Sequence, residues 1–259
     1  MKLVVKIGGA AFDDRELVGR FAKTIPDLCH EGHRLVIVHG GGAALSRTLK
    51  QLGCETTFID GLRVTDSKAR DVALMVLAGQ LNKQLVAAIG DAGQPCIGIC
   101  GGDLRIFRAT RKKQPDLGYV GEVCAVDFAW IERLWSLGVV PALASLALGF
   151  DGEYYNVNAD QLASACAVAG GADALVYLTD VAGVKDAEGS VIRRLDVNAI
   201  AAMVEEETVS GGMPPKLEAC TGALKNGVTR VLVLPATRAE VLPGFFTHPI
   251  DCGTEVIAS

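Results

Sequence analysis

The sequence lacks an excess of basic residues. It contains 25 Lys and Arg against 30 Asp and Glu, which gives a formal net charge of −5 and an isoelectric point near 5.4. A chain with this balance presents no diffuse positive field to nucleic acid or to anionic lipid. We therefore expect no nucleic-acid partner and no membrane partner, and the composition favours small-molecule ligands.

The sequence also lacks a membrane-length apolar run and a secretory signal. Its most apolar stretch, residues 137–150, contains Pro141 and is shorter than the about 20 residues that a spanning helix needs. The first residues already have a strand-like pattern, without the charged and apolar regions of a signal peptide. We therefore expect a cytoplasmic protein without a membrane segment.

Cysteine pairs with metal-ligand spacing are missing. The chain has eight cysteines, but none forms a C-x-x-C pair and none has a histidine nearby at ligand spacing. In a reducing compartment, scattered thiols of this kind are typically buried packing groups. We expect eight buried thiols and no dedicated metal ligands.

What the sequence does have is a regular alternation of short and long apolar segments. Half of its 259 residues are apolar, enough for a substantial core. The segment at residues 35–38 is apolar on both faces, as in parallel sheets that helices cover on both sides. The pattern predicts an α/β fold, a three-layer α/β/α sandwich with a central, mainly parallel sheet. The expected strands lie at residues 3–7, 35–38, 174–178 and 230–234, with helices at 14–30 and 43–52 after the first two.

No repeat or low-complexity linker divides the chain. We expect a single domain, 1–259, with an N-terminal lobe of about 1–150 and a C-terminal lobe of about 151–259, joined by a short loop near 148–156. A long helical pattern at 66–90 carries an apolar stripe that faces either the core or a second subunit. Turn residues at 186–190 predict a hairpin after Val184.

Two glycine-rich segments follow the first two expected strands. Lys6 precedes Gly8 and Gly9 at the carboxyl end of a strand, where α/β sheets open into a ligand crevice. Glycine lets backbone N–H groups approach an anion closely, so this segment suits a phosphate. The alternative is an ordinary strand-to-loop turn with a surface lysine.

The second segment is H-G-G-G at residues 39–42, directly before a helix. Its glycines present amide donors and a favourable helix dipole to a carboxylate or a phosphate. The spacing does not fit the dinucleotide fingerprint, and the chain contains no P-loop motif, so both of those nucleotide-binding classes are disfavoured. For His39, packing and hydrogen bonding are favoured over catalysis.

Two polar segments stand where helices are expected to begin. Arg63 lies just before a helix capped at residue 65 or 66, where its guanidinium can hold a carboxylate or simply face solvent. Asn156, Asn158 and Asp160 alternate before a helix expected at 161–169. Asn and Asp are common helix caps, but three polar side chains on one side of a loop exceed what capping requires.

A lysine stands at an unusual place near the C-terminal end of the chain. Lys216 follows G-G-M-P-P, near the N-terminus of a helix expected at 217–226. Cations are not favoured at a helix N-terminus, so an anionic ligand is expected to outweigh the dipole there.

Read in order, the motifs form one pattern. K-I-G-G, H-G-G-G, G-L-R-V-T-D, N-V-N-A-D, L-T-D-V-A-G-V and G-G-M-P-P-K resemble the amino acid kinase superfamily over essentially the whole chain. G-L-R-V-T together with N-x-N-A-D resembles the branch that phosphorylates N-acetyl-L-glutamate in arginine biosynthesis. That resemblance implies transfer of the ATP γ-phosphoryl group to the side-chain carboxylate, giving N-acetyl-L-glutamyl 5-phosphate. The alternatives are a kinase for another acylated glutamate or for aminoadipate, and a non-catalytic nucleotide or amino-acid sensor.

The resemblance also implies roles for individual residues. Lys6 and Lys216 would stabilise the migrating phosphoryl group, and Asp160 would orient both lysines. The N-terminal lobe would bind the acyl amino acid and the C-terminal lobe the nucleotide. Because a carboxylate nucleophile is already deprotonated near neutral pH, no general base is needed. The implied substrate-binding residues are Gly41, Gly42, Arg63, Asn156 and Asn158, and the implied nucleotide-binding residues are Gly8, Gly9, Asp180, Val181, Ala182, Gly183, Val184, Lys185, Thr208, Val209 and Ser210.

The same resemblance implies ligands and an oligomeric state. ATP would be the donor, with Mg²⁺ bound through the nucleotide phosphates. Arginine-inhibited relatives carry a helix ahead of the first strand, so we expect a homodimer without arginine feedback. Pro214 and Pro215 depart from the family pattern and put the geometry beside Lys216 in question.

Overall fold

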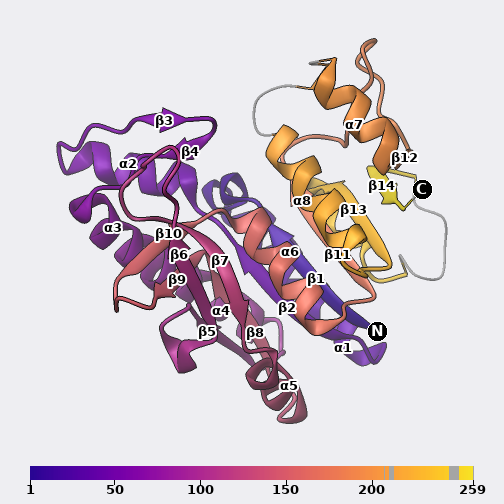
Figure 1. The fold of residues 1–259 in the computed structure, drawn as a ribbon. Coiled ribbons are helices and arrows are strands. Elements are labelled where there is room, and N and C mark those ends of the chain that lie inside the picture. Colours follow the sequence, from indigo (N-terminus) through magenta and orange to yellow (C-terminus); the bar gives the residue numbers. More distant parts are fainter. Residues whose placement is uncertain (207, 210–212, 245–250, 259) are drawn as a thin grey trace.

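An eight-stranded, mainly parallel sheet forms the centre of the molecule (Figure 1). The computed structural model describes residues 1–206, 208–209, 213–244 and 251–258. The last strand in sequence, β14 (Thr254–Ile257), runs antiparallel to its neighbour β13 (Arg230–Pro235), and β12 (Arg194–Asp196) pairs with β14 in parallel at the edge of the sheet. The α/β fold with a mainly parallel sheet is therefore confirmed. In spatial order the strands are β12 (Arg194–Asp196), β14 (Thr254–Ile257), β13 (Arg230–Pro235), β11 (Ala174–Thr179), β1 (Lys2–Ile7), β2 (Arg34–His39), β8 (Val140–Ala144) and β5 (Cys96–Ile99).

Helices cover both faces of this sheet because its central strands are apolar on both sides. In β1, Leu3 and Val5 belong to one buried core and Val4 to the other. Helices α6 (Ala159–Gly170) and α8 (Met213–Lys225) pack side by side over the second core (Figure 1). The first core lies under α1 (Arg15–His30), α2 (Gly42–Gln51), α3 (Ser67–Ala73), α4 (Asn82–Asp91) and the 3-10 segment η4 (Ala236–Val241), and the second under α5 (Phe128–Ser136), α6 (Ala159–Gly170), α7 (Val197–Glu205) and α8 (Met213–Lys225).

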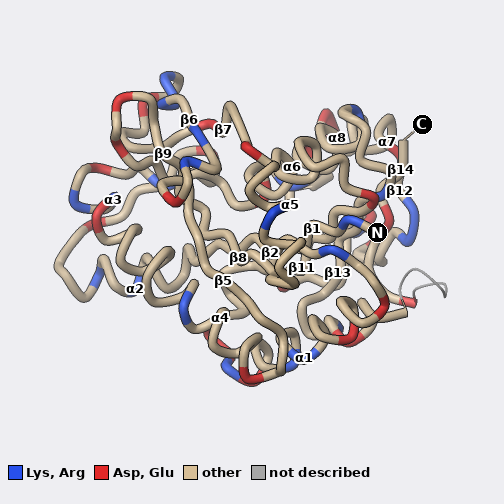
Figure 2. Tube along the Cα trace, turned by 90° about the horizontal axis from the view of Figure 1, so that it is seen from below, with Lys and Arg blue, Asp and Glu red and all other residues tan. Residues whose placement is uncertain are grey.

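Smaller β-structures flank the sheet. Four strands close on themselves beside it, and a two-stranded hairpin lies against the first turns of α2. Along the chain trace, Lys and Arg residues are interspersed with Asp and Glu residues (Figure 2). The four strands are β6 (Phe107–Arg111), β7 (Val120–Val126), β9 (Leu146–Gly149) and β10 (Tyr154–Val157); the hairpin is β3 (Phe58–Ile59) with β4 (Leu62–Arg63); short 3-10 turns are η1 (Gly9–Asp13) and η3 (Asp103–Arg105).

The helical pattern at 66–90 forms one long helix that changes its winding in the middle. Between α3 and α4 lies a π-helical segment, η2 (Leu74–Leu81). The buried residues Val72, Leu77 and Leu85 pack in the first core, so the apolar stripe faces the core. Within the described residues, this 25-residue helix is the one segment that is long and apolar enough to cross a membrane. Its packing is that of a core helix.

Several local expectations can be compared with the structure. The strands and helices expected before residue 52 and at 174–178 and 230–234 are confirmed within two residues. The hairpin after Val184 is reduced to a single bridge between Lys185 and Val191 around a turn. The division into two lobes stays a prediction.

The expectation of eight buried thiols is wrong. All eight cysteines are free, as expected, but only Cys100, Cys166 and Cys220 are buried. Cys124 is exposed on β7, because a strand in the small four-stranded unit has one face that no helix covers completely. A composition-based expectation cannot distinguish that face from the core.

Candidate active site

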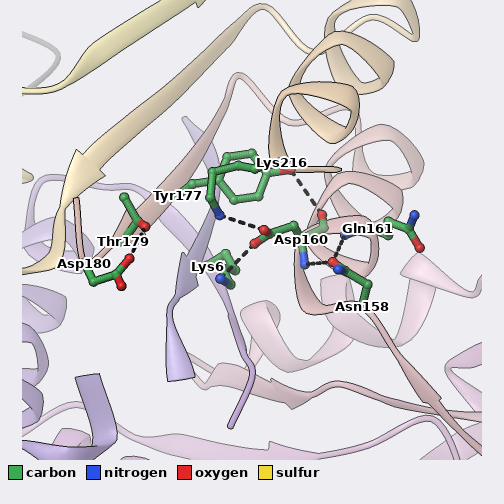
Figure 3. A network of polar contacts seen from close by, with 8 residues as sticks. All are labelled: Lys6, Asn158, Asp160, Gln161, Tyr177, Thr179, Asp180 and Lys216. Carbon is green, nitrogen blue, oxygen red and sulfur yellow. Dashed lines mark hydrogen bonds and ion pairs between the residues drawn. The ribbon is translucent and has the colours of Figure 1, made fainter. Parts of the chain in front are cut away.

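The carboxylate of Asp160 lies between two lysine ammonium groups from different elements (Figure 3). Lys6 is on β1, and its Nζ is 2.8 Å from Asp160 Oδ1. Lys216 is in the first turn of α8, and its Nζ donates to Asp160 Oδ2 at 2.6 Å. The structure therefore brings together side chains from three distant positions of the chain, 6, 160 and 216.

Burial and mutual attraction set the charges of this group. The side chains of Lys6, Asp160 and Lys216 are each at most 13% exposed. Burial lowers the pKa of Lys6 more than the Asp160 carboxylate raises it. Burial opposes ionisation of Asp160 as well, but the two lysines outweigh it and hold the pKa of that carboxyl below its usual value. Two ammonium groups share one carboxylate here. A further anion bound at this site would therefore be compensated by positive charge.

The N-terminus of α6 positions Asp160. The helix begins after Asn158, whose side-chain oxygen accepts from the N–H groups of Asp160 at 2.8 Å and Gln161 at 3.2 Å. This places Asp160 in the first turn, where the helix dipole favours a negative charge. Asn158 therefore acts as the cap of α6, while Asn156 is left to face the cavity described below.

Tyr177 is a site residue that the sequence reasoning missed. It lies on β11 directly beside Lys6 of β1, and it is completely buried. Its hydroxyl donates to the backbone carbonyl of Asp160 at 3.1 Å, and the Lys216 Nζ lies 5.1 Å from its ring centre. The sequence did offer one signal. Tyr177 is a polar aromatic residue among aliphatic neighbours in the strand that precedes the T-D motif.

A cavity of about 230 Å³ opens beside Lys6 and Asp160. Both glycine loops line it, and Arg63 and Asn156 close its other side. Gly42 is exposed at the N-terminus of α2, where an amide group can meet an anion. The predicted substrate-binding residues Gly41, Gly42, Arg63, Asn156 and Asn158 thus all line one space.

Gly41 allows the second glycine loop to lie close to the long helix. A Cβ at this position would come 2.3 Å from a Leu81 methyl carbon and 2.5 Å from one of Leu77. These leucines belong to the π-helical segment η2. The close approach holds the start of α2 against the core and leaves its first turn open to the cavity.

Arg63 is a buried cation with one unused donor. Its Nη2 donates to the Gly42 carbonyl at 3.0 Å and to Ser46 Oγ at 2.6 Å, and its guanidinium stacks 4.6 Å from the Phe58 ring centre. Burial lowers the pKa of Arg63. Among the described residues its Nη1 has no hydrogen-bond partner. A buried guanidinium with an unpartnered donor, on a residue that lines the cavity, is suited to a carboxylate ligand.

His39 has a structural position, in agreement with the favoured interpretation. The ring is completely buried; its Nδ1 is 3.0 Å from the Gly40 carbonyl, and its Nε2 is 3.0 Å from Asn82 Nδ2. An amide nitrogen only donates, so Nε2 is the acceptor and Nδ1 carries the proton. Burial lowers the pKa of His39 to about 4, so the ring is neutral at pH 7.

The predicted nucleotide-binding residues lie partly outside this cavity. Gly9 lines it, whereas the Gly8 N–H donates to the Leu178 carbonyl at 3.0 Å. Asp180 is exposed directly after β11, and its carboxylate accepts from Thr179 at 3.0 Å. The nucleotide roles of these residues stay predictions.

The other predicted nucleotide-binding residues differ in how far they are exposed. Gly183 and Val184 are buried, and the Val184 N–H donates to Thr254 at 2.8 Å. Of the second predicted loop, Thr208 is exposed and Val209 is half-buried, while Ser210 lies outside the described residues. The remaining residues, Val181, Ala182 and Lys185, are half-buried or exposed.

The fold is of the α/β class, with the two-lysine site at the carboxyl end of β1, and comparison with known proteins identifies the family. The model of the amino acid kinase family matches residues 1–235, and the chain belongs to this family. It is 56% identical to the acetylglutamate kinase of Koribacter versatilis and 55% identical to that of Acidobacterium capsulatum, each over 100% of both chains. The solved structure of smu.665 from Streptococcus mutans is 30% identical with a TM-score of 0.88, covering 100% of this chain and 99% of the other.

Proposed function

We infer that the chain transfers the γ-phosphoryl group of ATP to the side-chain carboxylate of N-acetyl-L-glutamate, the reaction of an acetylglutamate kinase. The identity to relatives of that name over their full length supports this activity. The structural observation that carries it is the Asp160 carboxylate between Lys6 and Lys216, beside a cavity with a buried arginine. The reaction belongs to amino-acid biosynthesis, and we place it in the arginine pathway.

The proposed chemistry needs positioning and charge stabilisation from the protein. A substrate carboxylate oxygen attacks the γ-phosphorus, a new P–O bond forms, the bond to the β-phosphate oxygen breaks, and ADP leaves with that electron pair. No proton is transferred, because the nucleophile is already an anion. We propose that Lys6 and Lys216 stabilise the charge on the migrating group and that Asp160 fixes both ammonium groups.

The acyl amino acid would occupy the 230 Å³ cavity. We propose that the amide groups of Gly41 and Gly42 hold the attacking carboxylate, and that the free Nη1 of Arg63, with Asn156, holds the α-carboxylate. Asn158 would contribute through the helix that it caps. The two carboxylates of the substrate would thus meet two separate donor groups.

ATP is the donor of a kinase of this family. We propose that its phosphates approach Gly8 and Gly9, that the nucleotide lies over residues 180–185 and 208–210, and that Mg²⁺ arrives on the phosphates. Within that path, Asp180 has an exposed carboxylate. Across the part of the chain that the structure describes, no group of three or more His, Cys, Asp or Glu side chains is arranged around a metal site.

Capture of the acyl phosphate with hydroxylamine tests the activity. The wild type should form the hydroxamate from ATP, Mg²⁺ and N-acetyl-L-glutamate, and K6M and K216M should each lose about 100- to 1,000-fold in kcat. K23M, which changes an exposed lysine on α1, serves as the matched control. ATP binding without product would instead support a sensor of the same fold.

Three finer points are tested separately. A panel of N-acetyl-, N-succinyl- and N-formylglutamate and aminoadipate derivatives, compared by kcat/KM, decides between the acylated substrates. We also propose a cytoplasmic homodimer, with Met75, 63% exposed on the long helix, and the edge strand β5 as the accessible apolar surface. Light scattering should give twice 27.1 kDa. Insensitivity to arginine stays a prediction, which activity at millimolar arginine tests.

A further inference from the structure

Tyr177 contacts two members of the lysine–aspartate group at once (Figure 3). Its hydroxyl donates to the main-chain carbonyl of Asp160 at 3.1 Å, and the face of its ring lies 5.1 Å from the Lys216 ammonium nitrogen. It is also the register partner of Lys6 on the neighbouring strand. One completely buried side chain thus adjoins all three charged residues.

The two contacts have different physical effects. The hydroxyl ties the first turn of α6 to β11, so the direction of the Asp160 side chain is fixed relative to the sheet. The ring presents the negative face of its quadrupole to the ammonium of Lys216 in a space from which water is excluded. Together they hold the Lys216 ammonium against the Asp160 carboxylate.

Packing alone does not call for a tyrosine at this position. The flanking buried residues of β11, such as Val176 and Leu178, are aliphatic, and an aliphatic or phenyl side chain fills a core without a polar atom. A buried hydroxyl is unfavourable unless it is hydrogen-bonded, and here it donates to the Asp160 carbonyl. The polar atom is therefore directed at the site.

We propose that Tyr177 is a positioning residue for phosphoryl transfer: its hydroxyl fixes Asp160, and its ring holds the Lys216 ammonium in place. This rests on the proposed kinase function. Because Tyr177 acts through Asp160 and Lys216 and does not line the cavity, its loss changes the stabilisation of the migrating group more than substrate binding.

Two substitutions separate the two contacts. Y177F keeps the ring and removes the hydroxyl, and should lower kcat about 5-fold, the effect of one hydrogen bond. Y177L also removes the ring, and should lower kcat about 30-fold or more, as expected for a desolvated cation–π contact. In both variants KM for ATP and for the acyl amino acid should stay within 2-fold. Y155F is the matched control, since the Tyr155 hydroxyl is also hydrogen-bonded, to Asp151 at 2.6 Å, but faces away from the site.

A spectroscopic readout tests the contact without the reaction. With ¹³C-labelled lysine, the ε-CH₂ protons of Lys216 should be shifted upfield by the ring in the wild type and in Y177F, and should move to ordinary values in Y177L; K216R assigns the signal. If Y177L does not fold, Y177F carries the kinetic test alone.

The outcomes distinguish the inference from the function on which it rests. A wild type that forms no acyl phosphate overturns the proposed function and the inference with it. An active wild type whose Y177F and Y177L variants keep full kcat overturns the inference alone. The same holds if KM rises while kcat stays constant, or if Y155F lowers kcat as much as Y177F.

Discussion

The backbone of Gly9 lies directly against the backbone of Gly41. A Cβ on Gly9 would come within 2.9 Å of both the Cα and the nitrogen of Gly41, a distance that real Cβ contacts do not reach. The loops after the neighbouring strands β1 and β2 therefore touch main chain to main chain. The obstacle is backbone and not a flexible side chain, so any side chain at position 9 must move one loop away from the other.

This contact makes Gly9 sensitive to the smallest substitution. We expect G9A to lower kcat/KM at least about 10-fold, since an ångström-scale displacement of positioning groups is costly in catalysis. G19A is the matched control: Gly19 lies inside α1 with open space around its Cβ, so the change should raise the free energy of unfolding by about 0.5 to 1 kcal/mol. Initial rates and urea unfolding measure both effects; equal activity of G9A and wild type would show that the loops separate without consequence.

Asp160 should matter for stability as well as for activity. In D160N two buried ammonium groups lose the carboxylate that they share, and we expect a loss of about 3 to 5 kcal/mol in the free energy of unfolding. Added sulfate should raise the melting temperature of D160N more than that of the wild type, because the anion replaces the missing charge. D116N, which changes an exposed aspartate in an ion pair with Arg111, is the control and should unfold like the wild type. A D160N protein as stable as the wild type would contradict the ion-pair geometry.

Arg63 should determine the affinity for the acyl amino acid. R63K keeps the charge but loses the planar fork and the free Nη1, so KM for N-acetyl-L-glutamate should rise about 10- to 100-fold, the effect of one or two hydrogen bonds to a charged group. The KM for ATP should change little. R47K, an exposed arginine that pairs with Asp13 at 2.5 Å, is the control. An R63K enzyme with an unchanged KM would place the α-carboxylate elsewhere.

His39 should make the stability of the protein depend on pH. Burial, and to a smaller extent Lys83, lowers the pKa of the folded-state imidazole to about 4, while the unfolded chain binds a proton near its ordinary value of 6.5. The unfolded state therefore gains protons first, and stability falls as the pH drops from 6.5 towards 4 and then levels off. The expected contribution between pH 7 and pH 4.5 is about 2 to 3 kcal/mol.

The variant H39Q isolates this contribution. It lacks the titrating group but keeps side-chain amide donors and acceptors near Gly40 and Asn82, and all other groups titrate equally in both proteins. Urea unfolding at a series of pH values should give a steeper acid loss for the wild type than for H39Q. Parallel curves would mean that His39 binds a proton equally readily in the folded and the unfolded state.

The parts of the molecule that sequence patterns predict are those set by local chemistry. A strand such as residues 35–38, apolar on both faces, has to lie inside a covered sheet, and Lys6 at the end of such a strand has to lie at the carboxyl edge. For the same reason the glycines before α2 were recognisable as an open helix N-terminus. The residues that line the cavity could be predicted from these local positions together with the family motifs.

Other features depend on which distant residues meet. Asn156 and Asn158 are identical side chains two positions apart, yet only the geometry of α6 shows that Asn158 is the cap. Tyr177 resembles a core residue until the register of β1 and β11 places it beside Lys6. The Asn82 amide reaches His39 across 43 positions. No periodicity in the sequence encodes these pairs.

The π-helical turn in the long helix also fixes the phase of everything that follows it. A π-helix advances by a smaller angle per residue than the roughly 100° of an α-helix, so the same eight residues Leu74–Leu81 wound as an α-helix would rotate the downstream turns relative to their present position. Asn82 would then point away from His39, and the leucine methyl groups would no longer meet the glycine backbone. The wide turn thus sets the positions of Leu77 and Leu81 against the H-G-G-G loop, and Leu77 itself lines the cavity.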